Sequence, residues 1–334
     1  MITIVGGGLT GLSLGIALRR REIPVALHEA GTYPRHRVCG EFISGVSRDT
    51  VHSLGIGDLL ADAKRHRSMA WFRRARKVFS VQLPGGIGIS RYTLDERLSR
   101  SFRELGGLLR ERSRWKPQGG EGLVWCGGRM PAKGRWIGLK CHVLGLDLQA
   151  DLEMHLASNG YVGLAKVEQD KINVCGLFRL DSSLSGKGIQ TLERYLRAGG
   201  LDGLAARIFA AGVNEESFLG VAGFQLGRQG HSDRIAPLGD AWAMIPPFTG
   251  NGMSMAFESA ELAAGPLQEW QMGREMWSET LERISRKLKC RFARRMFWGR
   301  AMHPFLTTNA GQALFTLVSR LGILPFQSCY HALR

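Results

Sequence analysis

The sequence lacks long apolar runs, closely spaced cysteine pairs and a balancing number of acidic residues. No stretch reaches the roughly 18 apolar residues that a membrane-spanning helix needs. The six cysteines include no C-x-x-C pair, which argues against a zinc centre and favours reduced thiols; we predict no metal site. An apolar strand begins at Ile2 and leaves no room for a signal peptide. We therefore expect a cytoplasmic protein.

Positive charge is in clear excess. The chain of 334 residues has 45 Lys and Arg against 29 Asp and Glu, a formal net charge of +16. Such a balance suggests nucleic acid, a membrane surface or an acidic substrate as partner, or simply a solvated basic surface. Residues 287–300 interleave cations with large apolar residues. They predict either a basic amphipathic helix on anionic lipid, placing the protein on the inner membrane face, or a core-packed helix with a solvated basic side. No nucleic-acid-binding motif accompanies them, so we predict no nucleic acid partner.

A glycine-rich turn follows the first predicted strand. Residues 2–5 are typical of a short buried strand, the turn spans Gly6–Gly11, and apolar residues recur with helical spacing over 12–21. A second apolar strand, 25–28, ends at Glu29. This order of strand, G-x-G-x-x-G turn, helix and acidic strand end predicts a dinucleotide-binding unit; a purely structural glycine turn is the alternative.

Each residue of the turn has an expected role. Gly6 permits the tight bend, Gly8 lets the backbone approach a pyrophosphate, and Gly11 lets the helix pack on the strand. The helix N-terminus offers free N–H groups and a partial positive charge to phosphates. Glu29 would accept hydrogen bonds from ribose hydroxyls. The remaining contact residues predicted here are Leu9, Thr10 and Ala30.

Two later motifs separate FAD from NAD. The strand 235–238 ends in Gly239-Asp240, and a Pro-Pro-Phe-Thr-Gly-Asn-Gly-Met loop then opens a long amphipathic helix, 252–267. This resembles the flavoprotein group of p-hydroxybenzoate hydroxylase, flavin-dependent halogenases and geranylgeranyl reductases. The resemblance implies that Asp240 binds the ribityl chain and that the helix N-terminus stabilises negative charge on reduced flavin. The loop residues carried over are Pro247, Gly250, Asn251, Gly252 and Met253.

Two arginine motifs extend this resemblance. Residues 35–44 resemble the R-x-K-x-C-G-E-x-x-S stretch of geranylgeranyl reductase-like enzymes. It implies that Arg35 or Arg37 contacts the FAD phosphates, as bidentate donors suit phosphate, and that Cys39 and Gly40 lie beside the isoalloxazine. Cys39 as a small buried filler is the alternative. Arg91 matches the arginine of an R-x-x-L-D-x-x-L helix start that reaches the cofactor, with a surface arginine as alternative. We place the start of that helix at Thr93, in a capping box with Glu96.

The central part of the chain predicts a second sheet. Residues 136–148, 154–156, 161–167 and 171–178 read as a run of antiparallel strands, and 47–60 as one helical stretch. Tyr161 and the Asn173-Val174 pair resemble the strand pair that walls the substrate cavity in the reductases; plain sheet core is the alternative.

The sequence departs from the resembled flavoproteins in two motifs. Residues 124–129 lack the Asp-Gly pair of the aromatic hydroxylases, and the W-x-W-x-I-P motif of the halogenases is missing.

Together these patterns predict an α/β fold with a Rossmann-like FAD-binding domain, an inserted antiparallel-sheet substrate domain and a helical C-terminal region. The FAD-binding domain would be discontinuous, built from 1–65, 86–130 and 230–268. The substrate domain would comprise 66–85 and 131–229, and the helical cap 269–334.

The predicted function is that of an FAD-dependent oxidoreductase resembling geranylgeranyl reductases. It would transfer hydride between flavin and a C=C bond of an apolar, isoprenoid or polyketide-like molecule, with NAD(P)H or another reduced donor supplying electrons. Catalytic candidates are Cys39, Glu41 and Tyr161. A monooxygenase or halogenase of the same fold is one alternative, and a non-catalytic FAD-binding, membrane-associated protein is another.

Overall fold

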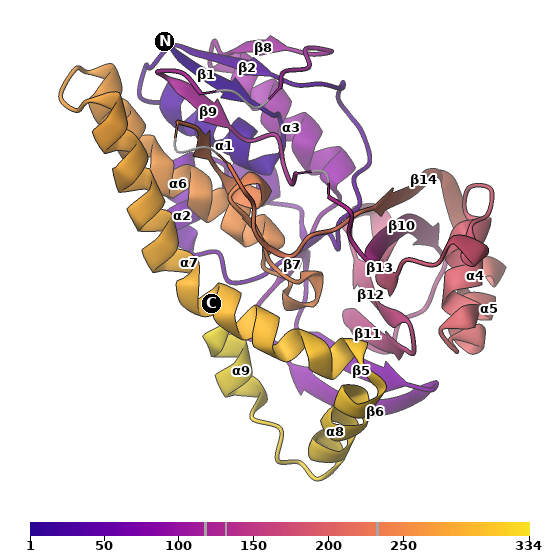
Figure 1. Ribbon diagram of the computed structural model, residues 1–334. Helices are drawn as coiled ribbons and strands as arrows, with labels where there is room; N and C mark the ends of the chain where they lie inside the picture. The colour runs from indigo at the N-terminus through magenta and orange to yellow at the C-terminus, as the bar shows by residue number, and fades with distance from the viewer. Residues whose placement is uncertain (117–118, 131, 232–233) are drawn as a thin grey trace.

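The computed structural model describes residues 1–116, 119–130, 132–231 and 234–334. Two larger β-sheets lie beside one another, and a long C-terminal helix runs from the helices of the first toward the second (Figure 1). No helix in these described ranges is long and apolar enough to cross a membrane.

The first sheet is parallel and has the strand order β16–β9–β1–β2–β8. The register sets Val5 beside His28 and Trp125, and Trp125 beside Pro237. Because parallel strands end at a common edge, the segments that follow these four residues meet there. The strands are β1 (Ile2–Val5), β2 (Val25–His28), β8 (Leu108–Arg110), β9 (Leu123–Trp125) and β16 (Ala236–Pro237).

Three helices pack around this sheet: α1 (Leu9–Arg19), α3 (Arg91–Glu104) and α6 (Gly252–Gln271). Helix α1 is buried along almost its whole length, between α3 and α6. Gly15 makes the α1–α3 contact close, since a Cβ at this position would lie 2.8 Å from the Phe102 ring.

The second sheet has seven strands in the order β14–β10–β13–β12–β11–β5–β6. All neighbours are antiparallel except β11 and β5. Apolar side chains of α4 (Gln190–Ala198) and α5 (Asp202–Ala210) share a core with it, including Leu192 and Ile208. The strands are β5 (Ser68–Arg73), β6 (Arg76–Gln82), β10 (Trp136–Leu144), β11 (Leu152–Ala157), β12 (Gly160–Lys166), β13 (Ile172–Arg179) and β14 (Gly212–Ala222).

Short elements connect these layers. A three-stranded sheet has the order β3–β7–β4, and β15 pairs with β17. Their bounds, with those of α2 and the 3-10 turns, are β3 (Phe42–Ile43), β4 (Lys64–Arg65), β7 (Ile87–Gly88), β15 (Gly227–Arg228), β17 (Ala243–Met244), α2 (Arg48–Leu54), η1 (Asp58–Leu60), η2 (Glu168–Asp170), η3 (Ser182–Leu184), η4 (Gly239–Ala241) and η5 (Pro247–Thr249).

The C-terminal region is helical: α7 (Trp277–Thr307), α8 (Asn309–Arg320) and α9 (Phe326–Ala332). The apolar side of α7, with Leu288 and Phe292, is buried against the core. Arg295 is also buried and donates to the fully buried Glu258 of α6 at 2.8 Å, while Arg291 donates to its other oxygen at 2.5 Å. On this side, residues 287–300 therefore agree with the prediction of a core-packed helix rather than one lying on lipid.

The predicted fold class is confirmed, with three local corrections. Ser90, not Thr93, caps α3: its hydroxyl accepts from the Thr93 N–H, and the helix begins at Arg91. The stretch 47–60 is not one helix, because Gly55 adopts a left-handed conformation and ends α2. The second sheet is not wholly antiparallel, because β5 joins β11 in parallel. The three-domain division stays a proposal, and its boundary residue 131 lies outside the described residues.

The α6–α7 contact generates a stability prediction. Glu258→Ala leaves the buried Arg295 guanidinium without its counter-charge, so we expect the free energy of unfolding in urea to fall by about 3–5 kcal/mol. The matched control is Glu193→Ala, which breaks the exposed pair with Arg197 and should cost less than about 1 kcal/mol. Equal losses in the two variants would contradict the prediction.

Candidate active site

The glycine turn lies at the common strand edge, and each glycine occupies a different environment. Gly6 has φ +107°, and a Cβ there would lie 2.2 Å from the Cys126 carbonyl oxygen on the neighbouring strand. A Cβ on Gly11 would lie 2.0 Å from the Gly6 oxygen. A Cβ on Gly8 would have Arg91 Nη2, at 3.7 Å, as its only neighbour within 4 Å among the described residues. Two glycines thus allow close backbone packing, while the third faces open space.

The N-terminus of α1 points into that space. Gly8 is the N-cap and supplies no side chain, so the N–H groups of the first turn, at Leu9 and Thr10, keep their capacity to donate. Thr10 also packs against Gly239, where a Cβ would lie 2.3 Å from the Thr10 hydroxyl. The turn and the Gly239-Asp240 segment, distant in sequence, therefore form one surface. On this surface the N-terminus of α1 is the part suited to an anion.

Glu29 is held beside the turn. Its two carboxylate oxygens accept from Gly7 N at 2.9 Å and Gly31 N at 2.8 Å. Burial raises the pKa of Glu29, but Arg37, the backbone N–H groups and Arg35 outweigh it, so the pKa lies below its ordinary value. The carboxylate is ionised and fixed at the end of β2, and Ala30 beside it is exposed.

Three arginines face two carboxylates next to Gly8. Arg91 makes a bidentate pair with Asp95 at 2.7 and 2.8 Å, and Arg35 pairs with Glu29. Arg37 lies 3.5 Å from both acids, and its buried Nε and Nη2 have no hydrogen-bond partner in the described part of the chain. Three positive and two negative side chains leave a net positive charge, which suits a diphosphate.

The Gly239-Asp240 turn and the loop after it form the opposite wall. Gly250 has φ +66°, Asn251 is the N-cap of α6, and Gly252 begins the helix facing open space. Asp240 is exposed and lines the cavity that begins at these loops. Desolvation by the surrounding protein raises the pKa of the Asp240 carboxyl, and the guanidinium groups of Arg91 and Arg129 oppose this.

An apolar cavity of about 530 Å³ begins at these loops. It extends between the seven-stranded sheet and the C-terminal helices, and its only charged lining side chains in the described ranges are Asp240 and Arg334. The predicted residues that it brings together are Cys39, Gly40, Tyr161, Asp240, Pro247, Gly250, Gly252 and Met253.

Tyr161 and Cys39 reach the cavity as neutral groups. The Tyr161 hydroxyl accepts from Phe248 N at 3.2 Å. Burial raises the pKa of Tyr161 and that of the Cys39 thiol, so both stay protonated near neutral pH. Glu41, the third catalytic candidate, does not line the cavity.

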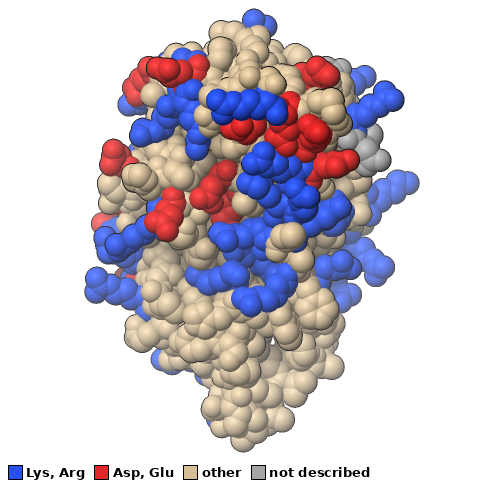
Figure 2. Space-filling view, turned by 90° about the vertical axis from the view of Figure 1, so that its left-hand side faces the viewer, with Lys and Arg blue, Asp and Glu red and all other residues tan. Residues whose placement is uncertain are grey.

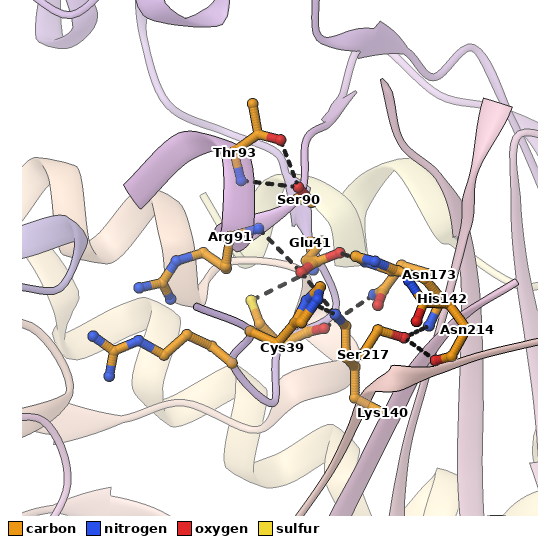
Figure 3. Close-up of polar contacts among 12 residues, drawn as sticks. Cys39, Glu41, Ser90, Arg91, Thr93, Lys140, His142, Asn173, Asn214 and Ser217 are labelled. Carbon is orange, nitrogen blue, oxygen red and sulfur yellow. Dashed lines mark hydrogen bonds and ion pairs between the residues drawn. The ribbon is translucent and has the colours of Figure 1, made fainter. Parts of the chain in front are cut away.

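Glu41 instead belongs to a buried polar network (Figure 3). One carboxylate oxygen contacts His142 Nε2 at 2.6 Å; the other accepts from Arg91 N at 3.0 Å and lies 3.4 Å from Lys140 Nζ. Burial raises its pKa, but the His142 hydrogen bond and the Lys140 charge outweigh this and lower the pKa overall. The network ties the 39–41 loop to β10 and to the start of α3.

Sequence reasoning missed Lys140 and His142. They point to one side of β10 because they are two residues apart, yet both side chains are almost fully buried. Asn173 of β13 adds to this attachment by donating to the Cys39 carbonyl at 3.0 Å. A lysine and a histidine at i, i+2 in an otherwise apolar strand were the available signal.

The residues present fit an FAD molecule. Gly8 faces open space beside the arginines, and a Cβ at Gly40 or Gly252 would meet no described residue within 4 Å. Buried guanidinium nitrogens of Arg37 lack hydrogen-bond acceptors in the described part of the chain. Within those same residues, no group of three or more His, Cys, Asp or Glu side chains could hold a metal ion.

Comparison with known proteins shows limited sequence similarity. No protein-family model matches the chain. It is 28% identical over 114 residues to menaquinone reductase of Mycobacterium tuberculosis, a match that covers 32% of this chain. The match spans only 28% of that relative's length.

Similarity of fold extends over the whole chain. A geranylgeranyl bacteriochlorophyll reductase-like protein from Thermoplasma acidophilum has a TM-score of 0.78 at 15% identity, covering 99% of this chain and 95% of its own. HpxO of Klebsiella pneumoniae, solved with FAD and uric acid, gives 0.76 at 15% identity, with 100% and 96% covered. For p-nitrophenol 4-monooxygenase from Pseudomonas putida the values are 0.75 at 13%, with 98% of each chain covered. The chain thus has the fold of this flavoprotein group.

The open position at Gly8 generates a binding prediction. Gly8→Val should abolish FAD binding, because the branched side chain fills the space beside Arg91. Asp240→Ala should weaken FAD binding about tenfold or more, through loss of a hydrogen bond to a charged group. Flavin absorbance and calorimetric titration measure both effects. Gly203→Val, at another open position near a helix start, is the control and should bind normally. Full FAD binding by Gly8→Val would show that the turn is not the site.

The buried network generates a pH prediction. Because the pKa of Glu41 is lowered in the folded protein, its carboxylate stabilises the fold above the unfolded pKa of about 4.5, and that stabilisation disappears as pH falls through the folded pKa. The unfolding free-energy difference between wild type and Glu41→Gln should be constant above about pH 5 and shrink in acid. Exposed Glu121→Gln is the control. A difference that grows on acidification would contradict the assignment.

Proposed function

We propose that the protein is an FAD-dependent oxidoreductase that transfers hydride between flavin and a C=C bond of an apolar substrate. The observation that carries the proposal is the apolar cavity, which starts at the Cys39-Gly40 and Pro247–Met253 loops and continues between the second sheet and α7–α9. Its apolar lining fits an isoprenoid- or polyketide-like chain better than a polar metabolite.

The geometry of the strand edge supports the proposed set of cofactor-binding residues. The Gly6–Gly11 turn and the first turn of α1 would hold the diphosphate, with Arg35, Arg37 and Arg91 neutralising its charge. Glu29 and Ala30 would lie at the adenosine ribose, and Asp240 at the ribityl chain. Bound FAD would supply the hydride-transfer chemistry, with NAD(P)H or another reduced donor as the electron source. The N-terminus of α6 would place a partial positive charge at the cofactor.

The chain's own residues would deliver the proton and keep water away. Tyr161 is neutral, faces the cavity and is held by Phe248 N, so it can donate a proton or a hydrogen bond to substrate. Cys39 is the other neutral donor at this wall. Glu41 is better described as a positioning residue, because its carboxylate is committed to Lys140 and His142.

A monooxygenase of the same fold is the second candidate, favoured by the likeness to p-nitrophenol 4-monooxygenase. The two functions differ in their need for oxygen. A reductase saturates its substrate without oxygen, whereas a monooxygenase or halogenase consumes oxygen and oxidises NAD(P)H in air.

The test is turnover without oxygen. Purified holoprotein reduced with NAD(P)H or dithionite should convert a polyprenyl substrate to a product heavier by two hydrogens, measured by mass spectrometry. Tyr161→Phe should lower the rate about 100-fold while FAD binding is retained. Tyr195→Phe is the control, since this buried hydroxyl bonds to Asp181 away from the cavity.

Three results would overturn the proposal. Oxygenated product formed only in air would support the monooxygenase. Bound FAD whose spectrum neither reductant nor apolar substrates change would support a non-catalytic flavoprotein. Protein that binds no FAD would remove the basis of both.

A further inference from the structure

One end of the molecule, here called the tip, is built from the end of α7, helix α8 with the loop after it, and the β5–β6 hairpin; it covers 305–325 and 73–77. We propose that the tip docks on an anionic lipid bilayer and that the apolar substrate enters the cavity there. This inference rests on the proposed function, because it names the source of the substrate for the same cavity.

Exposed apolar side chains are concentrated at and beside the tip. Of the fourteen large apolar residues that are exposed in the described ranges, seven fall between 297 and 323. A contiguous exposed apolar patch on a protein surface generally marks a binding face. The seven residues are Phe297, Trp298, Phe305, Leu314, Leu317, Leu321 and Ile323.

Helix α8 exposes an apolar stripe, unlike an ordinary surface helix. Leu314, Leu317 and Leu321 follow helical spacing and are 48%, 56% and 61% exposed. Its buried positions include the polar Gln312 and Thr316, whose side chains bond to backbone carbonyls. Helices on aqueous surfaces bury their apolar stripe and expose polar residues. The exposed leucine stripe therefore suits an apolar medium.

The same helix separates the cavity from the outside. Phe315 and Val318, on its inner side, line the cavity, while Leu314 lines it and is also half exposed. Phe305, at the end of α7, shares both properties. The outer surface of the tip and the cavity wall are thus continuous, so a lipid chain could pass from one to the other without crossing polar surface.

Charge around the tip is of one sign. The tip itself, residues 73–77 and 305–325, holds five Lys and Arg and no Asp or Glu. Arg74, Arg76 and Lys77 of the hairpin are exposed. Burial lowers the pKa of Arg73, and the charges of Arg74 and of Arg320 on α8 lower it further. Figure 2 shows Lys and Arg gathered across the middle of one face and a largely uncharged lower end.

An anionic bilayer satisfies both features. Apolar side chains of the tip would enter the headgroup–acyl boundary, and the surrounding cations would contact anionic headgroups. A second copy of this chain is a poorer partner, because pairing two tips would bring two cation-rich rims together.

The experiment is vesicle co-sedimentation of the full chain with FAD added. We expect binding to phosphatidylcholine vesicles containing phosphatidylglycerol, weaker binding to pure phosphatidylcholine, and weaker binding at high salt. Leu317→Ser/Leu321→Ser should reduce affinity about tenfold or more. Arg74→Glu/Lys77→Glu should reduce it about fivefold or more per residue. Leu144→Ser/Leu180→Ser, at two leucines elsewhere that are 47% and 48% exposed, is the control and should bind like wild type.

Several results would overturn the inference. The inference fails if the wild-type protein does not bind phosphatidylglycerol vesicles. It also fails if the leucine-pair variant binds them as strongly as wild type. A wild-type dimer in light scattering that becomes monomeric in the leucine-pair variant, without vesicle binding, would assign the tip to self-association. Brominated acyl chains should also quench the fluorescence of Trp298 in the wild-type protein. The Trp298→Phe variant, which lacks this fluorophore, is the reference.

Failure of docking is distinguishable from failure of the proposed function. The leucine-pair variant should keep wild-type FAD binding and wild-type turnover of a short, detergent-dispersed substrate, and lose only turnover of substrate embedded in vesicles. If wild type binds vesicles but neither FAD nor substrate, the proposed function fails while the docking surface stands.

Discussion

The contact between Gly6 and the main chain of Cys126 is the constraint on which the site depends. Cys126 N donates to Val5 O at 2.6 Å, and a Cβ on Gly6 would lie 2.2 Å from Cys126 O. Only a glycine with positive φ lets the chain turn away at that point, directly after the strand. The same turn sets the N-terminus of α1 at the strand edge. Glu29, which follows β2, and Asp240, in η4 after β16, lie at the same edge.

Two further connections hold the loops of that edge in relation to the second sheet. The Cys39–Glu41 loop is attached from behind, through Lys140 and His142 on β10 and through Asn173 on β13. An isolated carboxylate at a fully buried position would be strongly disfavoured, so its partners are as necessary as the residue itself. The network thus fixes one wall of the cavity without placing its charges in the cavity.

The sequence predicted features that depend on local order and missed those that depend on distant pairing. The Gly6–Gly11 turn, its strands and the Gly239-Asp240 turn could be recognised because their residue types follow one another at fixed spacing. Glu41 was named a catalytic candidate, and nothing nearby in sequence indicates its partner about a hundred residues away in β10. Helix α8 has leucines at helical spacing, and periodicity identifies a stripe but not whether it faces the core or the outside.

The cavity is charged and polar at one end and apolar along the rest of its length. At the cofactor end, arginines and helix N-termini face open glycines, so this end suits a charged, phosphate-bearing molecule. Beyond Asp240 the wall becomes aromatic and aliphatic, with Tyr161 as a neutral polar group aimed inward. The buried ions lie behind the Cys39-Gly40 wall, where they position backbone without raising the polarity of the reaction space. A hydride acceptor there would meet low polarity and a protonated hydroxyl, the combination that favours proton delivery over solvent exchange.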